Sequence, residues 1–264
     1  MRNMKTVILC GGFGTRIRDV ADNIPKPMIP IGNKPVLWHI MKYYSAWNFK
    51  DFVLCLGYKS DVIKNFFLNY ETSINDITIT LGEKNPIEIH NKHPETGWKI
   101  TMAETGLNAM TGARVKKIFK YVKDEENFML TYGDGVGDID IKKLVDFHNS
   151  HGKIITVTGV RPPGRFGELV YNDHQVVTGF NEKPQVTGGR INGGFFICRK
   201  ELFNYLNDDE DLVFEQEPLI NLVKDSQMRV YEHDGFWQPM DTYREYSLLN
   251  SLYNKGKAPW VIWK

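Results

Sequence analysis

A glycine-rich turn near the start of the chain has the residue types needed to bind a polyphosphate. The apolar run 6–10 leads directly into GGFGTR at 11–16, and glycines allow main-chain N–H groups to approach an anion because no Cβ is in the way. Arg16 adds a planar cation, and Lys26 adds a point charge between two prolines. A P-loop or a dinucleotide fingerprint would need a Lys-Ser/Thr pair or a third glycine, but Ile17 stands three places after the last glycine. For the GGxG pattern alone, a plain strand-to-helix connection stays the alternative.

Two further stretches carry polar groups next to predicted elements. Asp134 stands between two glycines directly after the apolar run 128–132. Carboxylates at the C-terminal ends of parallel strands point into the crevice where α/β sheets bind ligands, so Asp134 is a candidate metal ligand. The segment 105–114 places a glycine turn at a helix start, which can bind a base edge or an anion but can also be an ordinary helix cap. Asp241 precedes a helical pattern and could cap it.

The elements that must position these residues alternate between strands and helices along the chain. Apolar runs at 6–10, 52–56 and 128–132 are typical of buried strands, and the strongly β-branched run 154–160 predicts another strand. Helical spacing separates them, which predicts one doubly wound α/β domain. The stretch 74–103 is weaker: it predicts short strands in an insert at the sheet edge or in a surface for a partner subunit. His90 and His93 in it are expected to be surface residues.

Composition excludes several classes of function. The 264 residues carry a formal net charge of +1, so there is no broad basic surface for nucleic acid or an anionic membrane. The three cysteines have no metal-binding spacing and are expected to be buried, reduced thiols. No apolar stretch approaches 18 residues and no signal-peptide pattern opens the chain, so a cytoplasmic protein is expected.

Several motifs together resemble those of the sugar-phosphate nucleotidyltransferases. These are GGFGTR and PKPMIPIGNKP, followed by TYGDG, EKP and INGGFF, while GFWQPMDT at 235–242 and GKAPW at 256–260 are similar to the cytidylyl branch. The resemblance covers about residues 6–263 and implies a Rossmann-like, mostly parallel sheet of the nucleotide-diphospho-sugar transferase type. It also implies a single domain over 1–264, with a nucleotide-binding half at about 1–153 and a sugar-side lobe at about 154–264.

The activity that this resemblance implies is cytidylyl transfer from CTP to a sugar 1-phosphate, with α-D-glucose 1-phosphate as the expected acceptor. The acceptor oxygen is already ionised, so the site must position two anions and neutralise charge rather than supply a general base. By resemblance, Asp134 and Asp241 hold Mg²⁺, and for Asp241 we favour this role over the helix cap. Arg16 is expected at the departing pyrophosphate, Lys26 at the α-phosphate and Lys183 at the acceptor phosphate.

The resemblance also implies two sets of binding residues. Those expected at the nucleotide are Leu9, Cys10, Gly11, Gly12, Gly14, Thr15, Arg16, Lys26, Thr111, Gly112, Arg114 and Gly133. Those expected at the sugar phosphate are Gly167, Glu182, Lys183, Asn192 and Gly193.

Three positions depart from the pattern of the cytidylyl branch. Ile24 stands where that branch has a lysine, Ala109 where it has a small hydroxyl residue, and Ala113 where it has a glycine. The base and the acceptor therefore stay open. The alternative is a cytidylyltransferase, or another pyrimidine nucleotidyltransferase, that acts on a different phosphorylated acceptor. A non-catalytic nucleotide-sensing domain is disfavoured, because both carboxylates and all three phosphate-binding cations are present. The family commonly forms homo-oligomers, which is also expected here.

Overall fold

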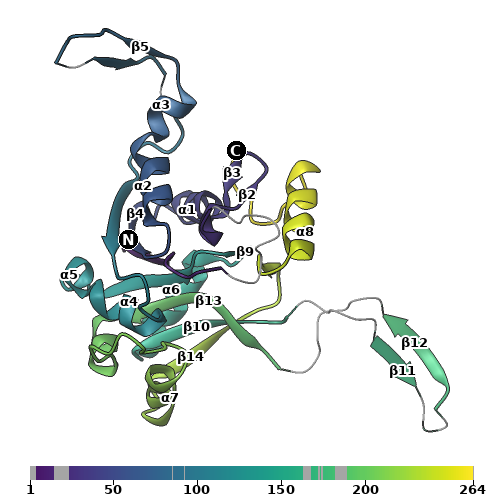
Figure 1. Ribbon diagram of the computed structural model, residues 1–264. Helices are drawn as coiled ribbons and strands as arrows, with labels where there is room; N and C mark the ends of the chain where they lie inside the picture. Colours follow the sequence, from purple (N-terminus) through teal and green to yellow (C-terminus); the bar gives the residue numbers. More distant parts are fainter. Residues whose placement is uncertain are drawn as a thin grey trace.

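A seven-stranded sheet in the order β14-β10-β13-β8-β1-β4-β7 forms the centre of the molecule (Figure 1). The computed structural model describes residues 4–14, 24–84, 86–91, 93–162, 168–171, 173, 175–181 and 189–263. Strand β13 is antiparallel to both of its neighbours and the other neighbouring pairs are parallel, so the predicted mostly parallel sheet is confirmed. The strands are β1 (Thr6–Leu9), β4 (Asp51–Leu56), β7 (Lys99–Glu104), β8 (Asn127–Tyr132), β10 (Ile155–Val160), β13 (Ile191–Arg199) and β14 (Met228–His233).

Helices cover both faces of this sheet, as expected for a doubly wound fold. Alternate residues of β1 enter different cores: Ile8 packs in one cluster, and Val7 packs in the other. The first cluster includes α1 (Val36–Ala46), α6 (Ile141–His151) and α8 (Tyr243–Asn254). The second includes α4 (Thr111–Lys117), α5 (Phe119–Val122), α7 (Glu217–Lys224) and the 3₁₀ helix η3 (Lys200–Tyr205).

A short two-stranded ladder brings two distant segments together at the C-terminal end of β8. Strand β9 (Gly135–Gly137) pairs antiparallel with β15 (Trp237–Pro239). The ladder continues beyond the strands, since the N–H of Met240 donates to the carbonyl oxygen of Asp134 at 2.8 Å. This pairing places Asp134 and Asp241 side by side although they lie far apart in the sequence.

Helix α8 begins at a complete capping box that does not use the Asp241 side chain. The side chain of Thr242 accepts from the N–H of Glu245, and the Glu245 carboxylate accepts from the N–H of Thr242. The cap role of Asp241 is therefore wrong, and its carboxylate is available for the cavity. At α6, Asp140 caps the helix by accepting from the N–H of Lys143 at 2.9 Å. Asp138 does not cap it, and its Oδ1 lies 2.9 Å from His233 Nε2.

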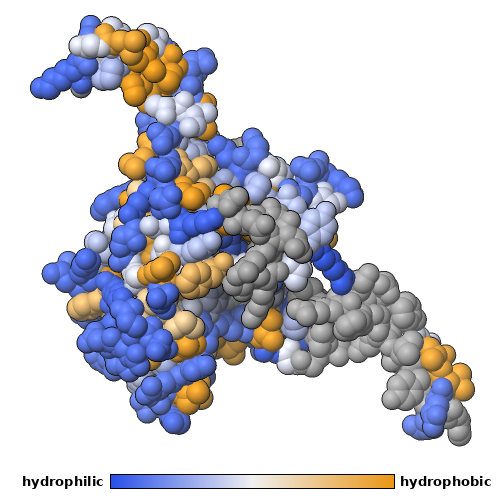
Figure 2. Space-filling model, viewed as in Figure 1, coloured by the Kyte–Doolittle hydropathy of each residue, from blue (hydrophilic) through white to orange (hydrophobic). Residues whose placement is uncertain are grey.

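Two hairpins project from the body (Figure 1). The first, β5 (Ile77–Ile79) with β6 (Ile87–Ile89), extends beyond α2 (Ser60–Leu68) and α3 (Tyr70–Ile74), and we call it the isoleucine arm. Its cross-strand pairs place four exposed isoleucines on one face, and hydrophobic side chains gather at this end of the molecule (Figure 2). The second is β11 (Glu168–Tyr171) with β12 (Val177–Asn181). The last part of the weakly predicted stretch 74–103 is not an insert, because it contains β7, the edge strand of the main sheet.

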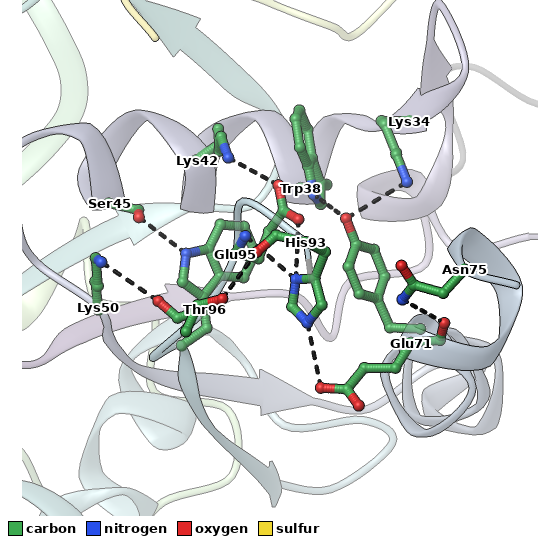
Figure 3. A network of polar contacts seen from close by, with 12 residues as sticks. Lys34, Trp38, Lys42, Ser45, Lys50, Glu71, Asn75, His93, Glu95 and Thr96 are labelled. Atoms are coloured by element: carbon green, nitrogen blue, oxygen red, sulfur yellow. Dashed lines mark hydrogen bonds and ion pairs between the residues drawn. The ribbon is translucent and has the colours of Figure 1, made fainter. Parts of the chain in front are cut away.

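A buried polar network fixes the base of the isoleucine arm to α1 (Figure 3). Lys42 on α1 forms an ion pair with Glu95 at 2.8 Å. The ring nitrogens of His93 lie 3.2 Å from carboxylate oxygens of Glu95 and of Glu71 on α3. His93 is therefore enclosed between two elements, and its prediction as a surface residue is wrong.

Among the described residues, no helix combines the length and the hydropathy that a membrane span requires.

Candidate active site

A cavity of about 490 Å³ opens at the C-terminal ends of β1 and β8. Its wall combines the glycine turn after β1, the 107–111 segment before α4, and the two aspartates joined by the β9–β15 ladder. This is the edge of an open α/β sheet at which ligands bind. Residues of the predicted set that line the cavity are Leu9, Cys10, Gly11, Gly12, Gly14, Lys26, Thr111, Arg114, Gly133, Asp134 and Asp241.

The ammonium group of Lys26 lies between the two aspartates. Its Nζ is 2.6 Å from Oδ2 of Asp134 and also donates to Oδ1 of Asp241. Lys26 stands on the short 3₁₀ turn η2 (Lys26–Met28), where flanking prolines restrict the backbone. Burial by itself would lower the pKa of Lys26, but the charges and hydrogen bonds of both carboxylates outweigh burial and raise it. The cluster therefore holds a fixed cation at neutral pH.

The donor set of this cluster fits a magnesium ion. Two carboxylates converge on one point, and their side chains keep 32% exposure on the cavity side. Mg²⁺ is usually held by one or two carboxylates together with waters and substrate phosphate oxygens. Among the described residues there is no group of three or more His, Cys, Asp and Glu side chains suited to a metal, so a cage built from protein side chains is absent there. Asp134 and Asp241 are the pair suited to an ion shared with a phosphate ligand.

The glycines of the wall are required by the backbone at two places. Gly14 has φ +62°, in the left-handed region that favours glycine, and a Cβ there would lie 3.0 Å from Cβ of Lys26. A Cβ on Gly133 would lie 2.8 Å from the carbonyl oxygen of Leu9, because the 133 N–H continues the parallel ladder to that oxygen. Nearby Cys10 is buried, and burial raises the pKa of its thiol, so it is a wall residue rather than a nucleophile.

Arg114 supports the cavity wall through hydrogen bonds to main-chain carbonyl oxygens. Its guanidinium donates to the carbonyl oxygens of Gly11 at 2.9 Å, Leu56 at 3.0 Å and Gly106 at 2.8 Å, which follow or end three neighbouring strands. The side chain is 4% exposed, and a Cβ on Gly11 or Gly57 would overlap its guanidinium. Burial lowers the pKa of Arg114, yet arginine stays charged at neutral pH. These contacts are those of a positioning residue. Arg114 also keeps a positive charge at the wall of the cavity.

Other predicted residues lie outside this cavity. The N–H of Gly112 donates to the carbonyl oxygen of Leu212 at 2.8 Å, which ties the start of α4 to the 207–216 loop. Asn192 and Gly193 lie at the start of β13, where the Gly193 carbonyl accepts from Trp237 Nε1 at 2.7 Å. Residues of the prediction that fall outside the described part of the chain are Thr15, Arg16, Gly167, Glu182 and Lys183.

The structure adds residues that sequence reasoning missed. Phe13, Leu107 and Met110 line the cavity with exposed apolar side chains, and they form a rim where a base or ribose can pack. Tyr132 also lines it, and its place directly before Gly133 was an available signal. No pattern in the sequence distinguished the rim residues, because exposure depends on how the loops fold together.

The three departures from the family pattern have different surroundings. Ala109 is buried and lines the cavity, so a missing hydroxyl there concerns the ligand directly. Ala113 is also buried, but it is not in the cavity lining. Ile24 packs against the hydrophobic core, which accounts for an apolar residue at this position.

Comparisons with known proteins identify the class. The profile of the nucleotidyl transferase family matches residues 5–247, and the chain belongs to this family. The prediction of an enzyme of the nucleotidyltransferase class is therefore confirmed.

Among curated proteins, the chain is 49% identical over 261 residues to glucose-1-phosphate cytidylyltransferase of Salmonella typhimurium, covering 99% of this chain and 100% of that protein. It is 44% identical over 262 residues to the probable glucose-1-phosphate cytidylyltransferase of Bacillus subtilis, covering 98% and 100%. The crystal structure of HddC from Yersinia pseudotuberculosis shares the fold, with a TM-score of 0.68 at 23% identity over 95% of this chain and 99% of that one. These matches confirm the resemblance stated from the motifs.

Proposed function

We propose that this enzyme transfers the cytidylyl group of CTP to α-D-glucose 1-phosphate and releases pyrophosphate, with CDP-glucose as the product. The observation that carries the proposal is the cluster of Lys26, Asp134 and Asp241 in the wall of a glycine-lined cavity. The names of the two curated relatives with nearly full-length matches support CTP and glucose 1-phosphate as the pair of substrates.

In this proposal the chain contributes orientation and charge rather than proton transfer. The glycine turn cradles the triphosphate with main-chain N–H groups, and Lys26 reaches the α-phosphate from between the aspartates. The acceptor phosphate is a ready nucleophile, so the barrier falls when both anions are aligned and their charge is offset. Asp134 and Asp241 would hold Mg²⁺, which, when bound, supplies positive charge at the reacting phosphates.

The acceptor side of the proposal rests on the second half of the chain. Lys183 is proposed to hold the sugar phosphate, Glu182 and Asn192 to meet sugar hydroxyls, and Gly167 and Gly193 to allow close approach. Arg16 is proposed to bind the departing pyrophosphate. A charge-assisted contact of this kind contributes about 1.5–3 kcal/mol, so Lys183→Ala should impair acceptor use far more than CTP binding.

The direct test is product analysis by mass spectrometry. The enzyme is mixed with CTP, UTP or GTP and with glucose 1-phosphate, mannose 1-phosphate or galactose 1-phosphate, with Asp134→Asn as the inactive control. We expect CDP-glucose to form fastest, with kcat/KM higher for CTP than for UTP, because a wrong exocyclic group leaves a buried partner unpaired. Equal use of UTP and CTP would contradict the cytidylyl assignment, and a faster acceptor would replace glucose 1-phosphate.

We also propose that the protein works in the cytoplasm as a homo-oligomer. Cys10, Cys55 and Cys198 are buried free thiols, which suits a reducing compartment. The isoleucine arm exposes four isoleucines in the single chain, and contiguous exposed apolar faces mark interfaces. Sedimentation at micromolar concentration should therefore give a mass above 30.5 kDa. A monomer throughout would contradict the oligomer.

A further inference from the structure

From its contacts we infer that Glu215 is a positioning residue that couples the nucleotide side of the site to the acceptor side, an inference that rests on the proposed function. Glu215 lies on the loop before α7 and is not in the cavity lining. Its carboxylate accepts hydrogen bonds from two residues that are: Thr111 Oγ1 at 2.7 Å and the hydroxyl of Tyr132. Nothing in the sequence motifs had singled it out.

The direction of the first hydrogen bond is fixed by the backbone. Thr111 Oγ1 accepts from the N–H of Phe214 at 2.9 Å, so its single proton is free to donate to Glu215 Oε2. Thr111 is the first residue of α4, the helix start expected at the nucleotide. Glu215 thus fixes the orientation of the Thr111 hydroxyl at the nucleotide side of the site, because this hydroxyl both accepts and donates a hydrogen bond.

The second hydrogen bond carries this order to the acceptor side. An ionised carboxylate only accepts, so the Tyr132 hydroxyl must donate to Glu215 and has its oxygen left to accept. That oxygen lies 3.2 Å from Nδ2 of Asn192. Asn192 Oδ1 accepts from the N–H of Gly194 at 2.9 Å, which leaves the second amide proton of Asn192 to donate to a ligand.

The ring of Tyr132 is held so that this chain of bonds keeps its geometry. Gly194 has φ +76°, and a Cβ there would overlap the ring. The ring also packs edge-on against Phe196 at 6.1 Å between centroids. Both contacts come from β13, the strand that carries Asn192, so ring and amide are fixed by one element.

Glu215 carries a negative charge near a site that is proposed to bind anions. Asp134 and Asp241 share Lys26, whereas no ion pair of Glu215 is found among the described residues. A carboxylate without a neighbouring cation would weaken phosphate binding by repulsion. Its favourable contribution to the site must therefore come from the hydroxyl groups of Thr111 and Tyr132 that it orders. We therefore expect its loss to change acceptor use more than overall folding.

The test is steady-state kinetics of the full chain, varying glucose 1-phosphate at saturating CTP and then the reverse. Glu215→Gln removes one acceptor and the charge, and the matched control is Glu217→Gln, two residues on and exposed. Misplacing Asn192 would weaken its neutral hydrogen bond to the sugar, which should raise the KM for the acceptor about three- to tenfold and move the KM for CTP by less. Tyr132→Phe, which keeps the ring, should reproduce the acceptor defect.

A double-mutant cycle with Asn192→Ala decides whether Glu215 acts through that amide. We expect Glu215→Gln to add little to the acceptor defect of Asn192→Ala, because coupled residues are non-additive. Full additivity, equal losses for CTP and acceptor, or a normal Tyr132→Phe would overturn the inference. A wild type inactive with CTP and glucose 1-phosphate would count against the proposed function instead, and the cycle would be run on the acceptor that it does use.

Discussion

Two lysine–carboxylate clusters in this molecule look alike in composition and differ in surroundings. In the cavity, Lys26 lies between Asp134 and Asp241, whose side chains are 32% exposed. At the base of the isoleucine arm, Lys42 pairs with Glu95, whose side chains are 9% and 3% exposed. The first stands at the C-terminal ends of sheet strands, and the second is enclosed between α1, α3 and the loop before β7 (Figure 3).

The difference shows why a cluster of charges is not by itself a site. The cavity carboxylates face open space, so an ion or a phosphate can exchange partners with Lys26 there. The arm cluster has its oxygens occupied by Lys42 and His93, and aromatic rings of Trp38 and Tyr70 close around it. A buried pair of this kind specifies packing and is costly to break from one side.

The largest expected effect is loss of turnover when a cavity carboxylate is neutralised. Asp134→Asn and Asp241→Asn should each reduce kcat by at least about a hundredfold, as expected for removing a preorganised electrostatic group. The double variant should be little worse than either single one, because residues that act as a unit are non-additive. Turnover measured over a range of Mg²⁺ concentrations checks this. Additive losses with an unshifted Mg²⁺ optimum would contradict a shared ion.

The arm cluster should respond in the opposite way. Glu95→Gln leaves Lys42 buried without its counter-charge, which should lower the free energy of unfolding by about 3–5 kcal/mol. Urea unfolding measures the change, and the kcat of the folded fraction should stay near that of the wild type. The solvent-exposed pair of Lys64 and Glu104 is the matched control, and Lys64→Ala should change stability by less than about 1 kcal/mol. A kcat loss in Glu95→Gln comparable to that of Asp134→Asn would contradict the assignment of a structural role to the arm cluster and a catalytic role to the cavity cluster.

An intermediate effect is expected where a buried cation supports the cavity wall. Arg114→Lys keeps the charge but cannot reach the carbonyls of Gly11, Leu56 and Gly106 together. Unsatisfied carbonyls cost about 1–3 kcal/mol each, and the KM for CTP should rise together with the loss of stability. Thermal unfolding measures the stability, and initial rates over a range of CTP concentrations give the KM. An unchanged KM with reduced stability would limit Arg114 to folding.

The smallest effect concerns pH and the core beside α1. Burial lowers the pKa of His39 to about 4, with Nε2 donating to the carbonyl of Ile31 at 2.9 Å. Between pH 6.5 and about 4, His39 is protonated in the unfolded chain but neutral in the folded chain. The free energy of unfolding therefore decreases as pH falls through this window, and His39 does not affect it at higher pH. The loss from His39 should be about 2 kcal/mol at pH 5.

The measurement for His39 is urea unfolding at pH 7.5 and pH 5. His39→Gln should flatten the difference between the two, whereas His90→Gln, at an exposed position of the isoleucine arm, should not. Equal pH dependence in the wild type and His39→Gln would show that other groups dominate.

Much of the sheet was predictable because its strands β1, β4, β8 and β10 are buried along most of their length. The runs that became these strands are rich in apolar or β-branched residues, and each was placed to within one or two positions. The meeting of Asp134 and Asp241 followed from motifs rather than from local patterns. The cap at α8 was also readable, since Thr242 and Glu245 have the spacing of a capping box.

The remaining features depend on contacts that no local pattern records. Glu95 stands two residues after His93, but the second carboxylate beside His93, that of Glu71, reaches it only through the packing of α3. The pairing of β7 with β4 and the two hydrogen bonds of Glu215 likewise join segments far apart in the sequence. Such features require the register of the whole sheet, which side-chain periodicity does not supply.

The most direct test of the difference between the two clusters is metal binding without turnover. Mn²⁺ would be titrated by electron paramagnetic resonance in the presence of a non-hydrolysable CTP analogue, with the wild type, Asp134→Asn, Asp241→Asn and Glu95→Gln. Each aspartate variant should weaken Mn²⁺ binding by at least about tenfold, since even indirect partners of a metal have effects of that size. Glu95→Gln should bind like the wild type. Undiminished Mn²⁺ binding by both aspartate variants would contradict a metal site at Asp134 and Asp241.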